Sequence, residues 1–157
     1  LTFLNPDRDP LGAGYQIIQS KIAIGSGGFM GKGFLKGTQS YLEFLPEKHT
    51  DFIFTLFAEE HGFLGSISLL LIYIILIYRV IKIGSISRSY FAKLFCYGYG
   101  SAIFIYVTVN MSMVLGLLPI VGSPLPIMSY GGSSMLATMI GFAIVMSAKI
   151  NHKQLVA

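Results

Sequence analysis

The densest group of ionisable side chains in the chain stands directly before a long apolar run. The segment Leu45-Pro46-Glu47-Lys48-His49-Thr50-Asp51 leads into that run, and Glu59 and Glu60 follow within it. Carboxylates and imidazoles can accept or donate protons, and carboxylates can also hold a cation. The sequence therefore predicts that polar chemistry is presented at the edge of a membrane, and this segment is the candidate site.

The composition is that of an integral membrane protein. Of the 157 residues, 54% are hydrophobic and 11% are charged, and the mean hydropathy is +0.70. Cys96 is the only cysteine, which excludes a disulfide framework and a cysteine metal site. The basic residues are spread among apolar runs, so we expect no nucleic-acid partner. Because the chain opens at Leu1 with a polar stretch and no basic-then-apolar leader, we expect it to be the C-terminal part of a longer protein.

Three apolar runs, residues 52–78, 94–118 and 133–148, predict an all-α fold with three transmembrane helices. As one straight helix, the first run would reach about 40 Å, more than the ~30 Å hydrocarbon core. Its uninterrupted apolar part ends at Tyr78, so the excess length falls at the Asp51 end. A straight helix would put Glu59 and Glu60 near the interface and Asp51 about 12 Å further along the axis.

The distribution of basic residues predicts the sidedness of the segments between the spans. By the positive-inside rule, residues 79–93 form a cytoplasmic loop and residues 149–157 a cytoplasmic tail. Residues 1–51, with five basic and five acidic residues, are then an outer loop, and residues 119–132 are outside as well. The two cytoplasmic segments contain no acidic residue, and their lysines and arginines are Arg79, Lys82, Arg88, Lys93, Lys149 and Lys153.

Two irregular segments accompany the spans. In the outer loop, Tyr15, Ile18 and Ile22 recur at helical spacing, which predicts a short amphipathic helix that ends at Gly25 and lies in the interface. Residues 119–132 are apolar but contain three prolines, at positions 119, 124 and 126, so they cannot form a regular helix. Irregular backbone at membrane depth must be buried in protein, so this segment is predicted to be a partly embedded, re-entrant loop.

The run Gly25-Ser26-Gly27-Gly28-Phe29-Met30-Gly31-Lys32-Gly33 is open to two interpretations. It departs from a Walker A loop at Ser26 and Gly33, and from a dinucleotide fingerprint at Met30. It is either a flexible glycine-rich loop or a loop whose backbone N–H groups, together with Lys32, meet an anionic group of a substrate.

Short motifs along nearly the whole chain resemble those of the SEDS family, the shape, elongation and division proteins that include RodA, FtsW and SpoVE. Residues 121–126 resemble the elongation branch, RodA, more than the division branch. There are two departures: the family's first seven spans are not in this sequence, and His61 stands where the family usually has an apolar residue. The matching motifs are Asn5-Pro6-Asp7, Gly12-Ala13-Gly14-Tyr15-Gln16, Gln19-Ser20, residues 23–28, Gly31-Lys32-Gly33, Gly37-Thr38-Gln39, Phe44-Leu45-Pro46-Glu47, His49-Thr50-Asp51-Phe52, Glu59-Glu60, Leu118-Pro119 and residues 129–134.

The resemblance implies that the chain corresponds to the outer loop and last three spans of a fold with roughly ten spans. It implies a peptidoglycan glycosyltransferase of the bacterial inner membrane, which polymerises lipid II on the outer face for cell-wall biogenesis, cell shape and cell division. Asp51 is implied as the catalytic residue, acting as general base or as ligand of a divalent cation, Mg²⁺ or Mn²⁺. Implied partners are lipid II, a class B penicillin-binding protein that crosslinks the product, and other membrane proteins of the elongation complex.

Further residues follow from what this reaction needs. Lys32, Lys36 and Lys48 are candidate contacts for the pyrophosphate, and His49 and Thr50 are candidate substrate-binding residues beside Asp51. Glu59 and Glu60 are predicted to pair with groups of spans outside this chain, and Asn110 to join helices. Structural roles are predicted for Glu59, Glu60, Asn110, Pro124, Pro126, Ser129, Gly131 and Gly132.

Three alternatives stay open. Asp51 could simply stabilise the start of a helix through the helix dipole. A flippase or transporter for a lipid-linked substrate would also show broken helices and intramembrane acids, although it should carry those acids near the bilayer centre. A non-catalytic scaffold for a cell-wall transpeptidase is the third alternative, and it would explain a chain that makes no glycan by itself.

Overall fold

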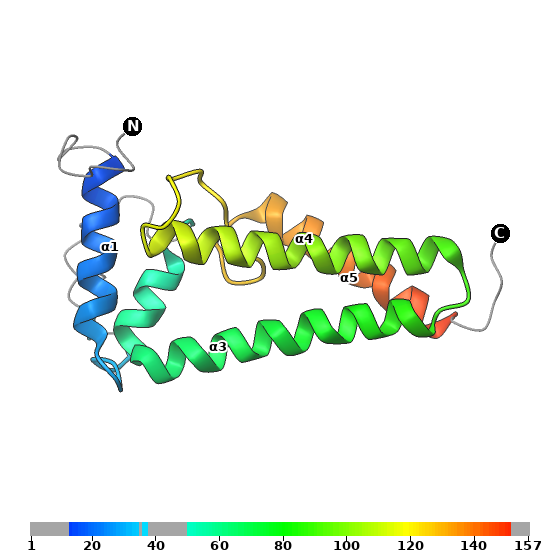
Figure 1. The fold of residues 1–157 in the computed structure, drawn as a ribbon, viewed down its shortest axis with the longest axis horizontal. Helices are drawn as coiled ribbons and strands as arrows, with labels where there is room; N and C mark the ends of the chain where they lie inside the picture. Colours follow the sequence, from blue (N-terminus) through cyan, green and yellow to red (C-terminus); the bar gives the residue numbers. More distant parts are fainter. Residues whose placement is uncertain (1–12, 35, 38–49, 152–157) are drawn as a thin grey trace.

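The structure, a computed structural model, describes residues 13–34, 36–37 and 50–151, and every regular element among them is a helix. These are α1 (Ala13–Gly27), α3 (Ile53–Ile86), α4 (Tyr90–Val114) and α5 (Gly132–Ile150), shown in Figure 1. The last three are long and apolar enough to cross a membrane. The predicted all-α fold with three transmembrane helices is therefore confirmed.

The helix ends differ from the predicted span ends. Helix α3 continues to Ile86 and α4 begins at Tyr90, so most of residues 79–93, predicted as a loop, is helical. The link between the two helices is only Ser87 to Ser89. The segment contains no proline and one glycine, so most of it can be helical, and the basic side chains are compatible with helix ends.

Helices α3 and α4 form a tightly packed antiparallel hairpin. Leu69 and Tyr73 of α3 are buried in one cluster with Ile103 and Val107 of α4. Near the link the helices approach closely, because a Cβ built on Gly84 would lie 2.8 Å from the Cβ of Cys96. Small residues allow such an approach between membrane helices, and packing then replaces the hydrophobic effect as the source of stability.

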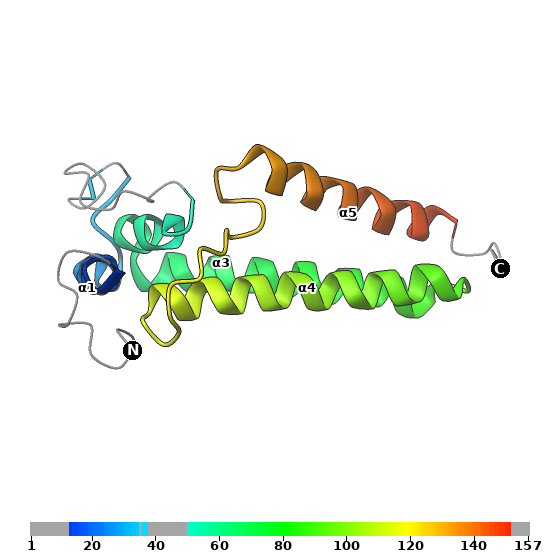
Figure 2. The same ribbon diagram turned by 90° about the horizontal axis from the view of Figure 1, so that it is seen from above.

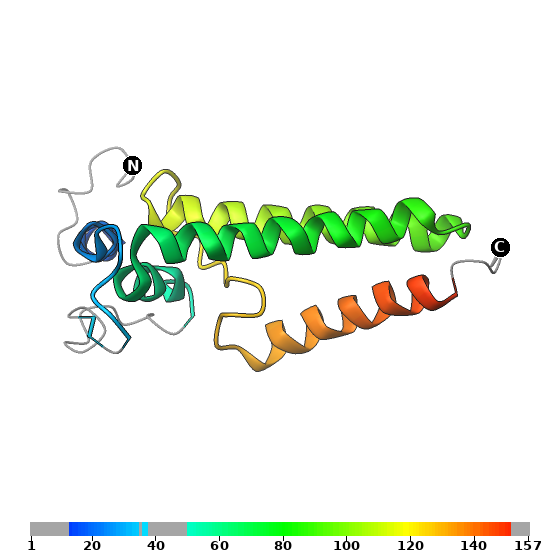
Figure 3. The same ribbon diagram turned by 90° about the horizontal axis from the view of Figure 1, so that it is seen from below.

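Helix α5 contacts this hairpin mainly through its second half. Figures 2 and 3 show α5 standing away from α3 and α4 at its start and converging on them toward its end. The Tyr99 ring meets Phe142 edge-on at 5.3 Å between centroids, and its hydroxyl donates to the Thr138 carbonyl oxygen at 2.7 Å. A Cβ on Gly141 would overlap the same ring, so this glycine makes room for Tyr99.

Helix α1 lies across the end of the hairpin, roughly perpendicular to it (Figures 1 and 2). The predicted helix is present and ends at Gly27 rather than at Gly25. Ile22, one of the large residues whose spacing predicted it, is 50% exposed. The buried face instead holds small residues, and the Ser20 hydroxyl on it donates to the Val114 carbonyl oxygen at 2.8 Å. Small side chains bring the backbones together, which a pattern of large apolar residues does not reveal. The buried residues are Gly14, Ile17, Ser20, Ala23 and Gly27.

Helix α3 is broken at Gly62, whose φ of 67° and ψ of −162° are not helical. The short part before the break turns sharply away from the long part in Figure 1. The prediction of one straight helix, with Asp51 about 12 Å further along its axis, is therefore wrong. A single glycine inside a helical pattern gives little warning of such a break, because glycine is tolerated within helices.

The glycine-rich segment packs against the break and satisfies its freed backbone groups. The N–H groups of Lys32 and Gly33 donate to the carbonyl oxygens of Glu59 and Glu60 at 3.1 and 3.0 Å. In return, the N–H groups that follow Gly62 donate to the carbonyl oxygens of residues 28 and 29 at 3.0 and 3.3 Å. Residues 28–33 are thus neither a flexible linker nor an open anion loop, because these two N–H groups are already used.

The proline-rich loop between α4 and α5 folds back against the helices, as its composition predicts. Leu125 is 1% exposed and lies in the main core cluster. The Tyr73 hydroxyl, from within the long part of α3, donates to the Pro126 carbonyl oxygen. Contacts of this kind let irregular backbone persist beside membrane helices.

Candidate functional site

Asp51 lies in a turn, residues 50–52, directly before α3, and this turn is fixed from two sides. The Asn110 side-chain amide of α4 donates to the Asp51 carbonyl oxygen at 2.9 Å and to the Ser123 carbonyl oxygen at 2.7 Å. The Ser129 hydroxyl donates to the Thr50 carbonyl oxygen. One helix and two points of the proline-rich loop therefore hold the backbone that carries the candidate carboxylate.

The side chains around this turn are anchored in the core and leave space at the carboxylate. Phe52 is 1% exposed and packs in the main core cluster with Met113, Val114 and Leu125. Gly122 has a φ of +68°, and a Cβ built on it would lie 3.3 Å from the Asp51 Oδ2 atom. A side chain at position 122 would be strained and would crowd the carboxylate. Gly122 and Ser123 were not among the predicted site residues, although they lie within the family-like motif of residues 121–126.

Asp51 lies one residue before the N-cap of α3. The residue at the N-cap is Phe52, which makes no side-chain capping hydrogen bond, and the first turn of α3 holds no acidic residue. An acid this close to a helix N-terminus interacts favourably with the helix dipole, so the helix-stabilising role of Asp51 stays open beside a catalytic one.

Asn110 acts differently from its predicted role. It was expected to join membrane helices, but its amide instead joins the Asp51 turn to the proline-rich loop. It is fully buried, so it does not face lipid.

We expect Asn110→Ala to destabilise the intact protein by about 2 kcal/mol, because two carbonyl oxygens in a half-buried site lose their donor. The matched control is Thr108→Ala on the exposed face of the same helix, where only a bond to the Phe104 carbonyl oxygen is lost. Its expected change is within about 0.5 kcal/mol. Thermal unfolding of both purified variants measures the difference, and equal melting temperatures would contradict the anchoring role.

Glu59, in the short part of α3, forms an ion pair with Lys32 of the glycine-rich segment. The Lys32 ammonium lies 2.8 Å from the Glu59 Oε1 atom, and the carboxylate is fully buried whereas the lysine side chain is 27% exposed. The prediction that Glu59 needs a partner outside this chain is therefore wrong. Truncating one partner of a buried pair typically costs 3–5 kcal/mol, so the pair holds the glycine-rich segment to the helix.

The other predicted site residues are distributed as follows. The Glu60 carbonyl oxygen accepts from Gly33, so its backbone belongs to the same contact. His61 is exposed, and its ring stacks on the Phe57 ring at 4.4 Å between centroids. This contact gives the imidazole an apolar neighbour at a position where the family usually has an apolar residue. Lys36 is exposed. Lys48 and His49 lie outside the described residues.

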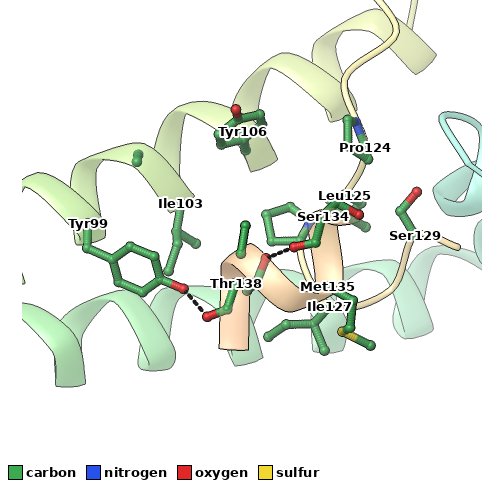
Figure 4. A pocket seen from close by; sticks show the side chains of 13 residues that line it. Tyr99, Ile103, Tyr106, Pro124, Leu125, Ile127, Ser129, Ser134, Met135 and Thr138 are labelled. Atoms are coloured by element: carbon green, nitrogen blue, oxygen red, sulfur yellow. Dashed lines mark hydrogen bonds between the residues drawn. The ribbon is translucent and has the colours of Figure 1, made fainter. Parts of the chain in front are cut away.

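A cavity of about 230 Å³ lies between α4, the proline-rich loop and the start of α5. Figure 4 shows Pro124 and Ser129 lining it from the loop, with Tyr106 across from them on α4. Pro126 also lines it, so three of the predicted structural residues shape this cavity. Gly131 and Gly132 lie at the start of α5, and a Cβ on Gly131 would meet the Ser134 hydroxyl at 2.7 Å.

The oxygen atoms near Asp51 are the kind that Mg²⁺ and Mn²⁺ prefer. Among the described residues, no group of three or more His, Cys, Asp or Glu could hold a metal ion. However, the Asn110 Oδ1 and Ser123 Oγ atoms are buried without a hydrogen-bond partner in the described part of the chain. Both belong to residues that surround the Asp51 turn. Mg²⁺ is commonly held by one or two carboxylates with waters and substrate phosphates, so the residues present fit such an ion.

The comparisons with known proteins agree with the motifs. The family model of FtsW, RodA and SpoVE, described as "Cell cycle protein", matches residues 1–154. The peptidoglycan glycosyltransferase MrdB of Escherichia coli is 55% identical over 155 residues, which are 99% of this chain and 42% of that protein. The peptidoglycan glycosyltransferase RodA of Treponema pallidum is 44% identical over 155 residues, 99% of this chain and 35% of that protein.

Solved structures agree in fold. A chain from a peptidoglycan synthase complex described as coordinating polymerization and crosslinking matches with a TM-score of 0.79 and 33% identity, over 98% of this chain and 41% of that chain. An Asp-to-Ala mutant of the Thermus thermophilus rod shape determining protein RodA matches with a TM-score of 0.67 and 34% identity, over 79% of this chain and 39% of that chain. The chain thus spans about two fifths of the length of these proteins. On its motifs, its fold and these matches, it belongs to the FtsW, RodA and SpoVE family.

Proposed function

We propose that this chain supplies the catalytic loop and three spans of a membrane enzyme that polymerises lipid II into peptidoglycan, with Asp51 as its general base. The observation that carries the proposal is the fixed turn: Asn110 and Ser129 hold the backbone on both sides of the candidate carboxylate. A catalytic group must be held in position by its surroundings to act efficiently. The names of the similar proteins supply the reaction class.

One carboxylate is enough for this reaction. The Asp51 carboxylate takes the proton of an acceptor sugar hydroxyl while that oxygen bonds to the anomeric carbon of the donor. The bond from the anomeric carbon to the lipid pyrophosphate breaks, and the pyrophosphate leaves with the electron pair. A diphosphate is a stable anion and needs no acid to protonate it, so the remaining requirement is positive charge near the leaving group.

Positive charge can come from this chain or from a bound cation. Lys32 is engaged with Glu59, which makes it less suited to the pyrophosphate than the sequence alone predicts. Asp51, with Asn110 and Ser123 nearby, would hold Mg²⁺ or Mn²⁺, and such an ion supplies charge neutralisation at the pyrophosphate when bound. Lys36, Lys48, His49 and Thr50 remain proposed contacts for the substrate.

The location of the charges supports chemistry at the outer surface of the inner membrane. No Asp or Glu follows Glu60 in the sequence, so the long part of α3 and all of α4 and α5 contain none. A transporter would be expected to carry acids near the middle of such helices. At the ends of α3 and α5 that lie away from Asp51, the basic residues Arg79, Lys82 and Lys149 favour a cytoplasmic location by the positive-inside rule. We therefore propose that Asp51 faces the outside.

The proposed partners are a class B penicillin-binding protein and other membrane proteins of the elongation machinery. A structural relative of this chain belongs to a complex that coordinates polymerization with crosslinking, which supports the first. The spans expose enough apolar surface for such contacts, since at most about a third of the most apolar stretch of each span is buried within the chain.

The test uses a chain of the relatives' full length that carries this sequence, purified with its transpeptidase and reconstituted in vesicles with lipid II. We expect glycan polymer to form, detected after electrophoresis of the products. Movement of labelled lipid II across the bilayer without polymer would instead indicate a flippase. If the protein neither forms polymer nor moves lipid II but still binds the transpeptidase, it acts as a scaffold, and the proposal is contradicted.

A further inference from the structure

Ile127, in the proline-rich loop between α4 and α5, has a backbone conformation that β-branched residues rarely adopt. Its φ is 72°, in the left-handed region, where the Cβ atom of an L-residue crowds the following carbonyl oxygen. Across the described ranges, every other residue with a positive φ is a glycine. A residue strained in this way persists only where its surroundings impose the conformation, and such residues cluster at functional sites.

Contacts within this chain fix the residues on both sides of Ile127. The Ser129 N–H donates to the Leu125 carbonyl oxygen at 3.0 Å, which closes a turn of five residues around Ile127. Leu125 is 1% exposed in the main core cluster, and the Pro126 carbonyl oxygen accepts from the Tyr73 hydroxyl of α3. The labelled residues of this turn can be followed in Figure 4. The closed turn therefore imposes the left-handed conformation on its central residue.

This turn is attached to the backbone beside Asp51. Ser129 is buried, and its hydroxyl donates to the Thr50 carbonyl oxygen. Gly122 of the same loop lies against the carboxylate, since a Cβ built on it would be 3.3 Å from the Asp51 Oδ2 atom. The bond from Asn110 to the Asp51 carbonyl oxygen runs directly from α4 and does not pass through residues 125–129. Opening of the turn would thus release one support of the Asp51 backbone and leave another in place.

The strain at Ile127 favours this opening. For residues other than glycine, the left-handed conformation is disfavoured by roughly 5- to 30-fold relative to the ordinary ones. Glycine adopts both about equally, as at Gly122 in the same loop, where φ is 68°. A turn that only had to stay closed would be more stable with glycine at position 127. With isoleucine there, the closed turn is weaker, and it opens more readily.

We propose that residues 125–129 form a strained latch on the Asp51 turn. When the latch is closed, Ser129 holds the Thr50 carbonyl oxygen and the carboxylate is in position. When it opens, Ile127 relaxes to a negative φ, the Ser129 contact is released, and the loop withdraws from the carboxylate so that the acceptor sugar can enter. The part of the latch in turnover rests on the proposed glycosyl transfer, whereas the strain and its release are properties of the fold.

Hydrogen exchange measures the latch without any substrate. The protein is the chain of the relatives' full length, folded in detergent, and the reporter is the Ser129 amide, whose hydrogen bond closes the turn. We expect Ile127→Gly to slow its exchange about 3- to 10-fold, because glycine removes the strain while its greater freedom in the open state offsets part of the gain. Ile127→Ala is the matched control: it keeps a Cβ atom and hence the strain, so exchange should not slow.

Turnover with lipid II then tests whether opening takes part in the reaction. We expect the kcat of Ile127→Gly to be about 3- to 10-fold below that of Ile127→Ala, because the open state is less populated. In chains that also carry Ser129→Ala, this difference should disappear, since the turn no longer holds the Thr50 carbonyl oxygen.

Three results would overturn the latch. Equal exchange in Ile127→Gly and Ile127→Ala would mean that the turn stores no strain at this position. Slower exchange in Ile127→Gly with an unchanged kcat would mean that the turn stays closed throughout the reaction. A difference in kcat that persists with Ser129→Ala would mean that release does not act through Ser129. The proposed function is tested separately by Asp51→Asn: if that variant polymerises normally, the catalytic assignment fails, while the exchange rates still decide whether the latch exists.

Discussion

An intact chain that carries Asp51→Asn is expected to polymerise lipid II about 10²- to 10⁴-fold more slowly than the unchanged protein, because an amide cannot accept the proton of the acceptor hydroxyl. If Asp51 also holds a divalent cation, the loss deepens, since an amide is a poorer ligand than a carboxylate. The folded state should change little, by about 1 kcal/mol or less, because asparagine keeps the size of aspartate and most of its ability to accept hydrogen bonds at a helix start. Initial rates at matched amounts of folded protein measure the effect.

Glu59→Gln is the comparison that separates catalysis from folding. The Glu59 carboxylate is buried against the Lys32 ammonium, so its removal should lower the yield and the melting temperature of the protein. The rate per folded molecule should fall far less than in Asp51→Asn. Near-normal turnover by Asp51→Asn would remove Asp51 from the mechanism and place the catalytic group outside this chain.

Gly62→Ala is expected to destabilise the intact protein by more than about 3 kcal/mol. The φ of 67° and ψ of −162° belong to a region that is nearly restricted to glycine, and strain there costs about 1–3 kcal/mol. A Cβ on Gly62 would also lie 2.3 Å from the Gly31 nitrogen, so the glycine-rich segment would have to move. The backbone hydrogen bonds between residues 28–33 and 59–64 would then weaken or break. Folded yield and thermal unfolding in detergent measure the loss.

Gly98→Ala serves as the control for this substitution. Gly98 lies within α4, is exposed, and has no atom within 4 Å of a built Cβ. Alanine favours a helix over glycine by about 1 kcal/mol, so this variant should be as stable as the unchanged protein or slightly more stable. If Gly62→Ala behaves in the same way, the break in α3 is not required by the fold.

The number and order of the spans could be predicted from sequence because they depend on local composition. Apolar runs of sufficient length identify the three spans, and the prolines at positions 124 and 126 identify a loop that cannot be a helix. The break at Gly62 escaped prediction because it depends on hydrogen bonds from residues 28–33, which lie some thirty positions away in the chain. No local pattern reports that those residues return to the same place.

The candidate site was predicted in part for the same reason. Asp51 stands out because it is an acid at the start of an apolar run. Asn110 lies 59 positions beyond Asp51, and Ser129 lies 79 positions beyond Thr50, so only the fold brings them to this turn. Asn110 was expected to join membrane helices, but side-chain amides bond equally well to helices and to loops, so its actual partners could not be chosen from sequence.

The middle parts of the three long helices carry no charged residue, which bears on the path of protons. No Asp, Glu, Lys, Arg or His occurs in residues 62–78 or in residues 94–148. In the proposed reaction, a proton released at Asp51 would find no relay of acidic or basic side chains through these three helices and would return to the aqueous phase on its own side. The proposed reaction is driven by breaking the bond between the anomeric carbon and the lipid pyrophosphate.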